Sequence, residues 1–239
     1  MAESYHSAQI VKTATGKQYH IGAGPGDVAP RILLVGDPAR ADKVAARFER
    51  VHVKRTNREY VTITGEHGGE PITVTATGIG CDNTEIAVVE LTQCVEAPTF
   101  IRVGSCGALA QGIALGDLVI SSGAVKLEST SSYFVPEGFP SVAHHECVLA
   151  LIEATAGLKG RGVHVGITAT ASGFYGAQGR QVPGFPPRDP DLPMKLAAMG
   201  VKNMEMEASL LFTLASLRGL RAGAVCAVYA NRQADTFVD

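Results

Sequence analysis

Residues 100–107, which read Phe-Ile-Arg-Val-Gly-Ser-Cys-Gly, constrain this chain more than any other stretch. Their apolar start predicts a buried strand through about Val103, and the two glycines that follow predict a turn. Arg102 interrupts the strand, and a buried guanidinium is costly unless a carboxylate or another anion satisfies its donors. Two interpretations therefore stay open. Either Arg102 pairs with a structural carboxylate, or it holds an anion that the glycine-rich backbone approaches closely.

The other apolar runs predict an α/β chain built on a mixed sheet. Ile32–Val35 is a continuous apolar run, as found in a sheet that is covered on both faces. Residues 51–76 alternate like an antiparallel meander with a turn at Gly68-Gly69, so the sheet is not purely parallel. Further elements are expected as strands at 99–103, 118–122, 163–169 and 222–229, and as helices at 83–95, 146–156 and from 203–208 to about 217.

A helix is also expected directly after the first strand, from Pro38 to about Phe48. Asp37 suits its N-cap, and Pro38 suits its first position. Arg40 then falls in the first turn, where a cation opposes the helix dipole. An anion bound at this helix start would explain Arg40, and an ordinary solvated arginine is the alternative.

Length and charge limit the possible classes of protein. The 239 residues suffice for one large domain or at most two small ones, and because no linker divides them we predict a single domain over 1–239. The 21 Lys and Arg residues nearly balance the 23 Asp and Glu residues, so charge gives no argument for nucleic acid or an anionic membrane as partner. No apolar run is long enough to span a bilayer, and residues 1–6 lack the pattern of a signal peptide.

Cysteine usage indicates a compartment. The five cysteines are odd in number, and none forms a C-x-x-C pair. They indicate reduced thiols in a cytoplasmic protein, and they predict neither disulfides nor a metal site.

Two further stretches are candidates for ligand binding. Residues 172–193 contain five prolines and little regularity, and a loop of this length is usually a lid or a specificity element. Its segment from Phe174 to Arg180 suits the binding of a planar ring, although a merely solvated loop is the alternative. Glu205 and Glu207 lie two residues apart in an extended segment, so their carboxylates share one side. Acidic residues before a helix are also ordinary dipole partners.

Several short segments, taken together, resemble the nucleoside phosphorylases of the class that forms trimers and hexamers, and most closely the members that cleave uridine. The resemblance extends from about residue 17 to the end of the chain, and it rests on the order and spacing of the segments rather than on any one. The matching segments are Tyr19-His20, Gly36-Asp37-Pro38-Ala39-Arg40, Asn57-Arg58-Glu59-Tyr60, Thr77-Gly78-Ile79-Gly80, Arg102–Gly107, Phe174–Arg180, Met204-Glu205-Met206-Glu207 and Asn231-Arg232.

The resemblance implies a fold and a reaction. The fold is an α/β, three-layer αβα sandwich with a mixed, partly barrel-like central sheet. The reaction is phosphorolysis of a pyrimidine nucleoside, with uridine and phosphate giving uracil and ribose 1-phosphate. No cofactor or metal is implied, because inorganic phosphate is the co-substrate. A homo-oligomer is implied, a dimer at least and a hexamer by expectation.

The resemblance also assigns roles to residues of this sequence. Phosphate is expected at Gly36, Arg40, Arg102 and Ser105, with Arg58 supplied by a neighbouring subunit. The ribose is expected at Met206, Glu207 and, across a subunit interface, His20. The base is expected at Phe174, Gln178 and Arg180, with support from Glu205 and Arg232. The residues expected to carry catalysis are Arg40, Arg102, Gln178 and Arg180.

Three departures and three alternatives remain. Ser105 stands where the family often has threonine, residues 183–187 form an unusual Pro-Gly-Phe-Pro-Pro run, and the family's final helix is missing after Asp239. Two explanations of the missing helix stay open: the chain is cut there, or this member closes its site differently. A purine nucleoside phosphorylase is the main alternative. That class generally has an aspartate just after the last strand, whereas this chain has Asn231-Arg232 there and Asp235 only further on, which favours a pyrimidine. A nucleosidase that uses water and a non-catalytic nucleoside-binding protein are the others.

Overall fold

The computed structural model describes residues 7–238. Residues 1–6, for which the sequence predicts no signal peptide, and Asp239 lie outside the described residues. The chain forms two compact units. The first comprises the residues up to Gly78 together with Ile86–Thr99, and the second comprises Ile79–Glu85 and the residues from Phe100 on. The expectation of a single domain stays a prediction.

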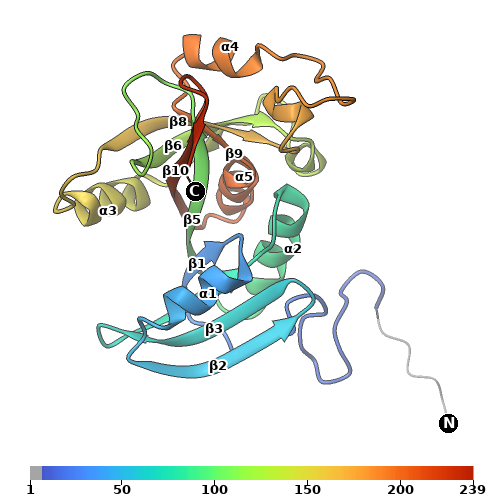
Figure 1. Cartoon of the computed structure of the whole chain (residues 1–239). Coiled ribbons are helices and arrows are strands. Elements are labelled where there is room, and N and C mark those ends of the chain that lie inside the picture. Colours follow the sequence, from blue (N-terminus) through green and yellow to red (C-terminus); the bar gives the residue numbers. More distant parts are fainter. Residues whose placement is uncertain (1–6, 239) are drawn as a thin grey trace. The chain divides into compact units, whose positions relative to one another are not determined.

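The first unit is built on a four-strand sheet (Figure 1). Its strands lie in the order β1 (Arg31–Val35), β4 (Glu70–Ala76), β3 (Tyr60–His67) and β2 (Arg50–Asn57). The β1–β4 pair is parallel and the other two pairs are antiparallel, which confirms the predicted meander and the mixed sheet. Helix α1 (Pro38–Ala45) packs against β3 and β4.

The start of α1 is as predicted, but its end is not. The Asp37 carboxylate accepts a hydrogen bond from the Ala39 amide at 2.9 Å, and Pro38 occupies the first turn. The α-helix ends at Ala45 rather than near Phe48. The amides of Arg47 and Phe48 donate to carbonyls only three residues back, so the chain tightens and leaves the α-helix there.

The second unit contains a closed ring of strands. β5 (Thr99–Ala108), β6 (Leu118–Leu127), β8 (Val163–Ala171), β9 (Asn203–Glu205) and β10 (Arg221–Asn231) lie in the order β10-β6-β8-β9-β5, and β5 also pairs with β10. Two short strands pair antiparallel with members of the ring: β7 (Ser141–Val142) with β6, and β11 (Thr236–Phe237) with β10. The predicted α/β fold with a partly barrel-like mixed sheet is confirmed.

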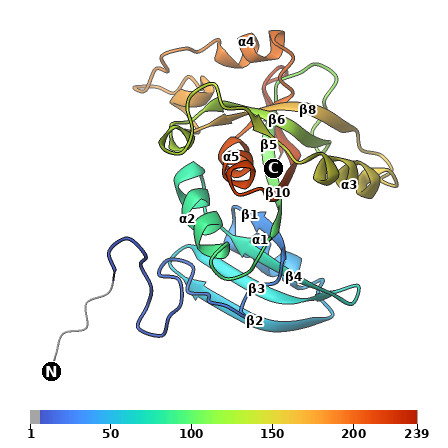
Figure 2. The same ribbon diagram turned by 180° about the vertical axis from the view of Figure 1, so that it is seen from behind.

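Helices flank this ring. α3 (His145–Thr155) packs against β6 and β10, while α5 (Ala208–Leu217) packs against β6, β8 and β10. The two helices lie on either side of β10 (Figures 1 and 2). The remaining α-helices are α2 (Cys81–Leu91) and α4 (Leu192–Ala198). None of the helices within residues 7–238 has the length and apolar character needed to cross a lipid bilayer.

Two local predictions were wrong. The turn expected at residues 104–107 is absent from this part of the chain, because β5 continues to Ala108 and pairs with β9 there. The helix expected from Asn203 begins only at Ala208, because Asn203–Glu205 form β9 between β8 and β5. In both places, pairing with strands distant in sequence keeps the backbone extended.

Candidate active site

Arg102 lies inside the second unit in a cluster with two carboxylates. Its Nε donates to Glu205 Oε2 at 2.8 Å, and its Nη2 forms an ion pair with Glu207. Only 6% of Arg102 is exposed. Burial opposes its charge, but Glu207 and Glu205 more than offset this and raise the pKa of Arg102. The carboxylate partner that the sequence left open is therefore present, and both expected carboxylates meet this guanidinium.

Glu205 connects Arg102 to the start of α5. Its carboxylate also accepts from Thr170 Oγ1 at 2.6 Å, from the Glu207 amide at 2.8 Å and from the Ala208 amide at 3.0 Å. These donors stabilise its negative charge at a helix start. Among the described residues no ion pair joins Glu205 to Arg232, with which the resemblance groups it. A direct role of Glu205 in the base pocket stays a prediction.

Glu207, the second carboxylate beside Arg102, is buried. It accepts a hydrogen bond from the Gly80 amide at 2.6 Å. Burial raises the pKa of Glu207, although the nearby Arg102 charge acts in the opposite direction. Its neighbour Met206 is half-buried, and the Met206 carbonyl accepts from Cys81 Sγ at 3.3 Å. A carboxylate can accept further hydrogen bonds from hydroxyl groups, as the expected ribose contact requires.

Gly104 makes the Arg102 cluster possible. A Cβ atom at position 104 would lie 2.8 Å from Nη2 and 2.9 Å from Cζ of Arg102, and 3.0 Å from Sγ of Cys226. Gly104 is therefore needed because the Arg102 side chain lies close against the backbone of its own strand, and not because the chain turns there. Ser105 follows it in β5 and is half-buried.

Five residues are expected around the base, and the structure brings four of them together. These are Phe174, Gln178, Arg180 and Arg232. The Arg180 guanidinium lies 3.9 Å from the centre of the Phe174 ring, and its Nε donates to the Phe174 carbonyl at 2.9 Å. Arg180 Nη2 donates to Gln178 Oε1 at 3.4 Å, and Arg232 Nη1 donates to the Gln178 carbonyl at 3.1 Å. Gln178 itself is 4% exposed. Two arginines thus hold one buried amide side chain and its backbone.

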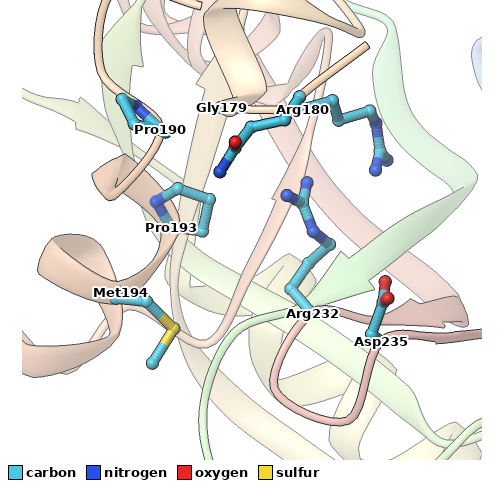
Figure 3. A pocket seen from close by; sticks show the side chains of 8 residues that line it. Gly179, Arg180, Pro190, Pro193, Met194, Arg232 and Asp235 are labelled. Atoms are coloured by element: carbon cyan, nitrogen blue, oxygen red, sulfur yellow. The ribbon is translucent and has the colours of Figure 1, made fainter. Parts of the chain in front are cut away.

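A cavity of about 370 Å³ lies beside these arginines (Figure 3). Figure 3 shows Arg232 pointing toward the segment that carries Gly179 and Arg180, with Asp235 nearby. Burial lowers the pKa of both Arg180 and Arg232, and the charge of Arg232 lowers that of Arg180 further. Within residues 7–238, neither guanidinium forms an ion pair. Such a pair favours a ligand rich in carbonyl oxygens or negative charge. The lining residues are Gly179, Arg180, Gln181, Pro190, Pro193, Met194, Arg232 and Asp235.

Replacing Gly179 with alanine is expected to disturb this cavity. Gly179 has φ +65°, and its Cβ would lie 2.9 Å from Pro193 Cδ and 3.0 Å from the carbonyl oxygens of Asp189 and Pro190. The strain should destabilise the fold by about 1–3 kcal/mol. The KM for the nucleoside should rise roughly tenfold as Arg180 shifts. Steady-state kinetics measure this rise, with Gly176→Ala as the control because a Cβ there meets no atom within 4 Å. An unchanged KM would contradict the assignment of this cavity to nucleoside binding.

The first unit carries the other expected residues. Gly36 follows β1 and accepts a hydrogen bond from the Gly78 amide at 3.0 Å, while Arg40 lies in the first turn of α1 as predicted. Gly36 and Arg40 belong to one unit, whereas Arg102 and Ser105 belong to the other. A shared role in phosphate binding stays a prediction.

Tyr19 connects His20 with Arg58, a link that the sequence did not reveal. The Tyr19 and His20 rings meet edge to face at 5.0 Å, and Arg58 lies 5.4 Å from the centre of the Tyr19 ring. Arg58 Nη2 donates to the Tyr19 hydroxyl at 3.4 Å. Arg58 stands in the short β2–β3 connection at φ +53°, a conformation that non-glycine residues rarely adopt and that is frequent at functional sites. His20 and Arg58, the two residues expected to serve a neighbouring subunit, thus lie on one surface around Tyr19.

Comparisons with known proteins identify the family of this chain. Residues 30–239 match the phosphorylase superfamily. A uridine phosphorylase of Thermococcus kodakarensis is 48% identical over 241 aligned positions, covering 99% of this chain and 86% of that protein. A uridine phosphorylase of Escherichia coli is 38% identical over 90% of this chain and 86% of its own length. A guanosine phosphorylase of Halorubrum lacusprofundi is 35% identical over 90% of this chain and 84% of its own length. The resemblance seen in the sequence is confirmed, and the chain belongs to the phosphorylase superfamily.

Proposed function

We propose that this protein is a pentosyltransferase that cleaves uridine with inorganic phosphate, giving uracil and ribose 1-phosphate. The observation that carries the proposal is the buried Gln178 held between Arg180 and Arg232. An amide offers a donor and an acceptor, and a guanidinium offers only donors. Uracil presents an O4 acceptor, an N3–H donor and an O2 acceptor along one edge, which this combination can match. The uridine phosphorylases among the relatives support the same reaction.

The chemistry requires positioning and charge stabilisation. A phosphate oxygen bonds to C1′ of the ribose while the bond from C1′ to N1 breaks, and the bonding electrons leave with the base. Positive charge develops on the ribose beside the phosphate, and negative charge develops on uracil beside Gln178 and Arg180. Because phosphate is already an anion, no general base has to activate it. Inorganic phosphate is the co-substrate, and we propose no other cofactor.

The remaining roles follow the family resemblance. Gly36, Arg40, Arg102 and Ser105 bind phosphate, and Arg58 of a neighbouring subunit completes that site. Met206 and Glu207 hold the ribose hydroxyls. The shared surface of Tyr19, His20 and Arg58 supports an assembly in which one subunit serves the next. We therefore propose a homo-oligomer built from dimers, with a hexamer as the expected form, acting in the cytoplasm.

One observation favours a purine nucleoside as the second candidate. Asp235 follows β10 and lines the cavity with Arg180 and Arg232. An acid at this place could protonate a purine base, and a guanosine phosphorylase is among the relatives. Asp235 is thus the residue that keeps this alternative open.

The proposed function is tested by measuring kcat/KM for uridine, cytidine and inosine with and without phosphate. Uridine should be cleaved only with phosphate. Cytidine should be poorer by roughly 10–200-fold, because its amino group would face a guanidinium donor without an acceptor. Inosine exceeding uridine would establish the purine alternative. Cleavage without phosphate would indicate a nucleosidase, and binding without turnover would indicate a non-catalytic protein.

A further inference from the structure

The turn that carries His20 is held by a carboxylate seventy residues away. Glu90 lies in α2 and is buried, with 8% of the residue exposed. Its Oε2 accepts from the amides of His20 at 3.0 Å and Ile21 at 2.8 Å. Its Oε1 lies 2.7 Å from Nδ1 of the His20 ring. One side chain therefore binds both the backbone and the ring of the same turn.

The opposite side of the turn is also held. Asn57 Nδ2 donates to the Tyr19 carbonyl at 2.9 Å and to the His20 carbonyl at 2.7 Å. Glu90 thus satisfies the amides of the turn, and Asn57 satisfies its carbonyls. Because Glu90, Asn57 and the turn all belong to the first unit, the position of His20 is set within that unit.

The contact with Glu90 determines how the imidazole can act. A carboxylate oxygen accepts hydrogen bonds, so Nδ1 has to carry the proton that it donates. In the neutral ring Nε2 is then an acceptor, and in the charged ring it is a donor. The His20 side chain is 32% exposed, whereas the Glu90 side chain is 11% exposed. The carboxylate occupies Nδ1, which leaves Nε2 as the ring nitrogen for a ligand.

We propose that Glu90 is a positioning residue that fixes the tautomer and location of His20, so that Nε2 meets the 5′-hydroxyl of the nucleoside. This inference rests on the proposed function, in which His20 serves the ribose of a neighbouring subunit. Glu90 itself touches no substrate. Its substitution by glutamine keeps the shape but replaces one acceptor oxygen by an NH₂ donor. That group either opposes the turn amides or donates to Nδ1 and reverses the tautomer.

The kinetic test compares uridine with 5′-deoxyuridine, which lacks the hydroxyl. In the natural protein the ratio of kcat/KM for uridine to that for 5′-deoxyuridine should be high. Glu90→Gln and His20→Ala should each lower this ratio roughly tenfold, mainly through the KM for uridine. The double variant should lower it no further. Glu85→Gln on the same helix is the matched control and should keep the natural ratio. Equal losses on both substrates, or additive losses in the double variant, would overturn the proposal.

A second measurement does not depend on activity. In protein labelled with ¹⁵N-histidine, the His20 signals are identified by their loss in His20→Ala. The neutral ring should carry its proton on Nδ1, and Glu90→Gln should shift these signals. A natural protein with the proton on Nε2 would overturn the role of Glu90. A protein with the Nδ1 proton that fails to cleave uridine would instead refute the proposed function and keep the Glu90–His20 arrangement.

Discussion

Replacing Arg102 with alanine is expected to lower turnover by roughly 100-fold or more at saturating phosphate, because the donor that we propose for the reacting phosphate is lost. The same change should destabilise the protein by about 3–5 kcal/mol, because it leaves two buried carboxylates without their cation. Glu205 and Glu207 both pair with this guanidinium inside the second unit. Phosphorolysis rates and urea unfolding measure the two effects separately.

The loss of stability in Arg102→Ala should depend on pH. Burial already raises the pKa of Glu207 in the folded state, and removing Arg102 takes away the charge that opposes this rise. A carboxyl group with a raised folded-state pKa favours the fold while it is protonated and disfavours it once ionised. The variant should therefore be closest to the natural protein in acid, with the difference growing as pH rises through that pKa. Unfolding at about pH 5 and about pH 8 tests the direction.

Arg102→Lys separates charge from geometry. The lysine retains a cation for the carboxylates, so most of the stability should return. An ammonium lacks the planar fork of donors, so activity should stay low. Near-normal phosphorolysis in Arg102→Ala at saturating phosphate would show that Arg102 does not bind phosphate.

Replacing Gly104 with alanine should have the second largest effect. In most strands this change is neutral or stabilising, because alanine loses less backbone entropy on folding. Here the new Cβ would lie 2.8 Å from Nη2 of Arg102 and 3.0 Å from Sγ of Cys226. Arg102 would have to leave its position beside Glu205 and Glu207. We expect a loss of about 1–3 kcal/mol in stability and at least a tenfold loss in kcat/KM.

Gly107 in the same strand supplies the matched control for stability. Its Cβ would lie no closer than 3.6 Å to any atom, which is an ordinary contact with Arg232 Cγ. Gly107→Ala should therefore be neutral or slightly stabilising in a thermal or urea unfolding experiment. If both variants were equally stable, the close approach of Arg102 to residue 104 would not be the reason for the glycine.

The sequence by itself determined the elements whose signals are local. Continuous apolar residues located β1, Asp37 and Pro38 located the start of α1, and Gly68-Gly69 marked a turn where both residues have positive φ. The spacing of Glu205 and Glu207 placed both carboxylates on one side. Each of these signals depends on backbone geometry within a few residues, so no distant contact was needed to interpret it.

The tertiary structure alone decided the features that join distant residues. The full length of β6 and β8 was not predictable from apolar runs, because the two strands continue past residues 122 and 169 to Leu127 and Ala171. In the missed part of β8 the polar Thr170 is buried, and its hydroxyl group donates to Glu205 at 2.6 Å. A polar residue reads as exposed in a sequence until its partner is known.

The same reason applies to the candidate site. The sequence identified Arg102 as a residue in need of a partner, but the fold selected Glu205 and Glu207 as its partners. The sequence also gave no sign that Glu90 would bind the ring of His20. The partner of a buried polar group is set by which strands and helices meet, and that choice depends on contacts across the whole unit rather than on local sequence.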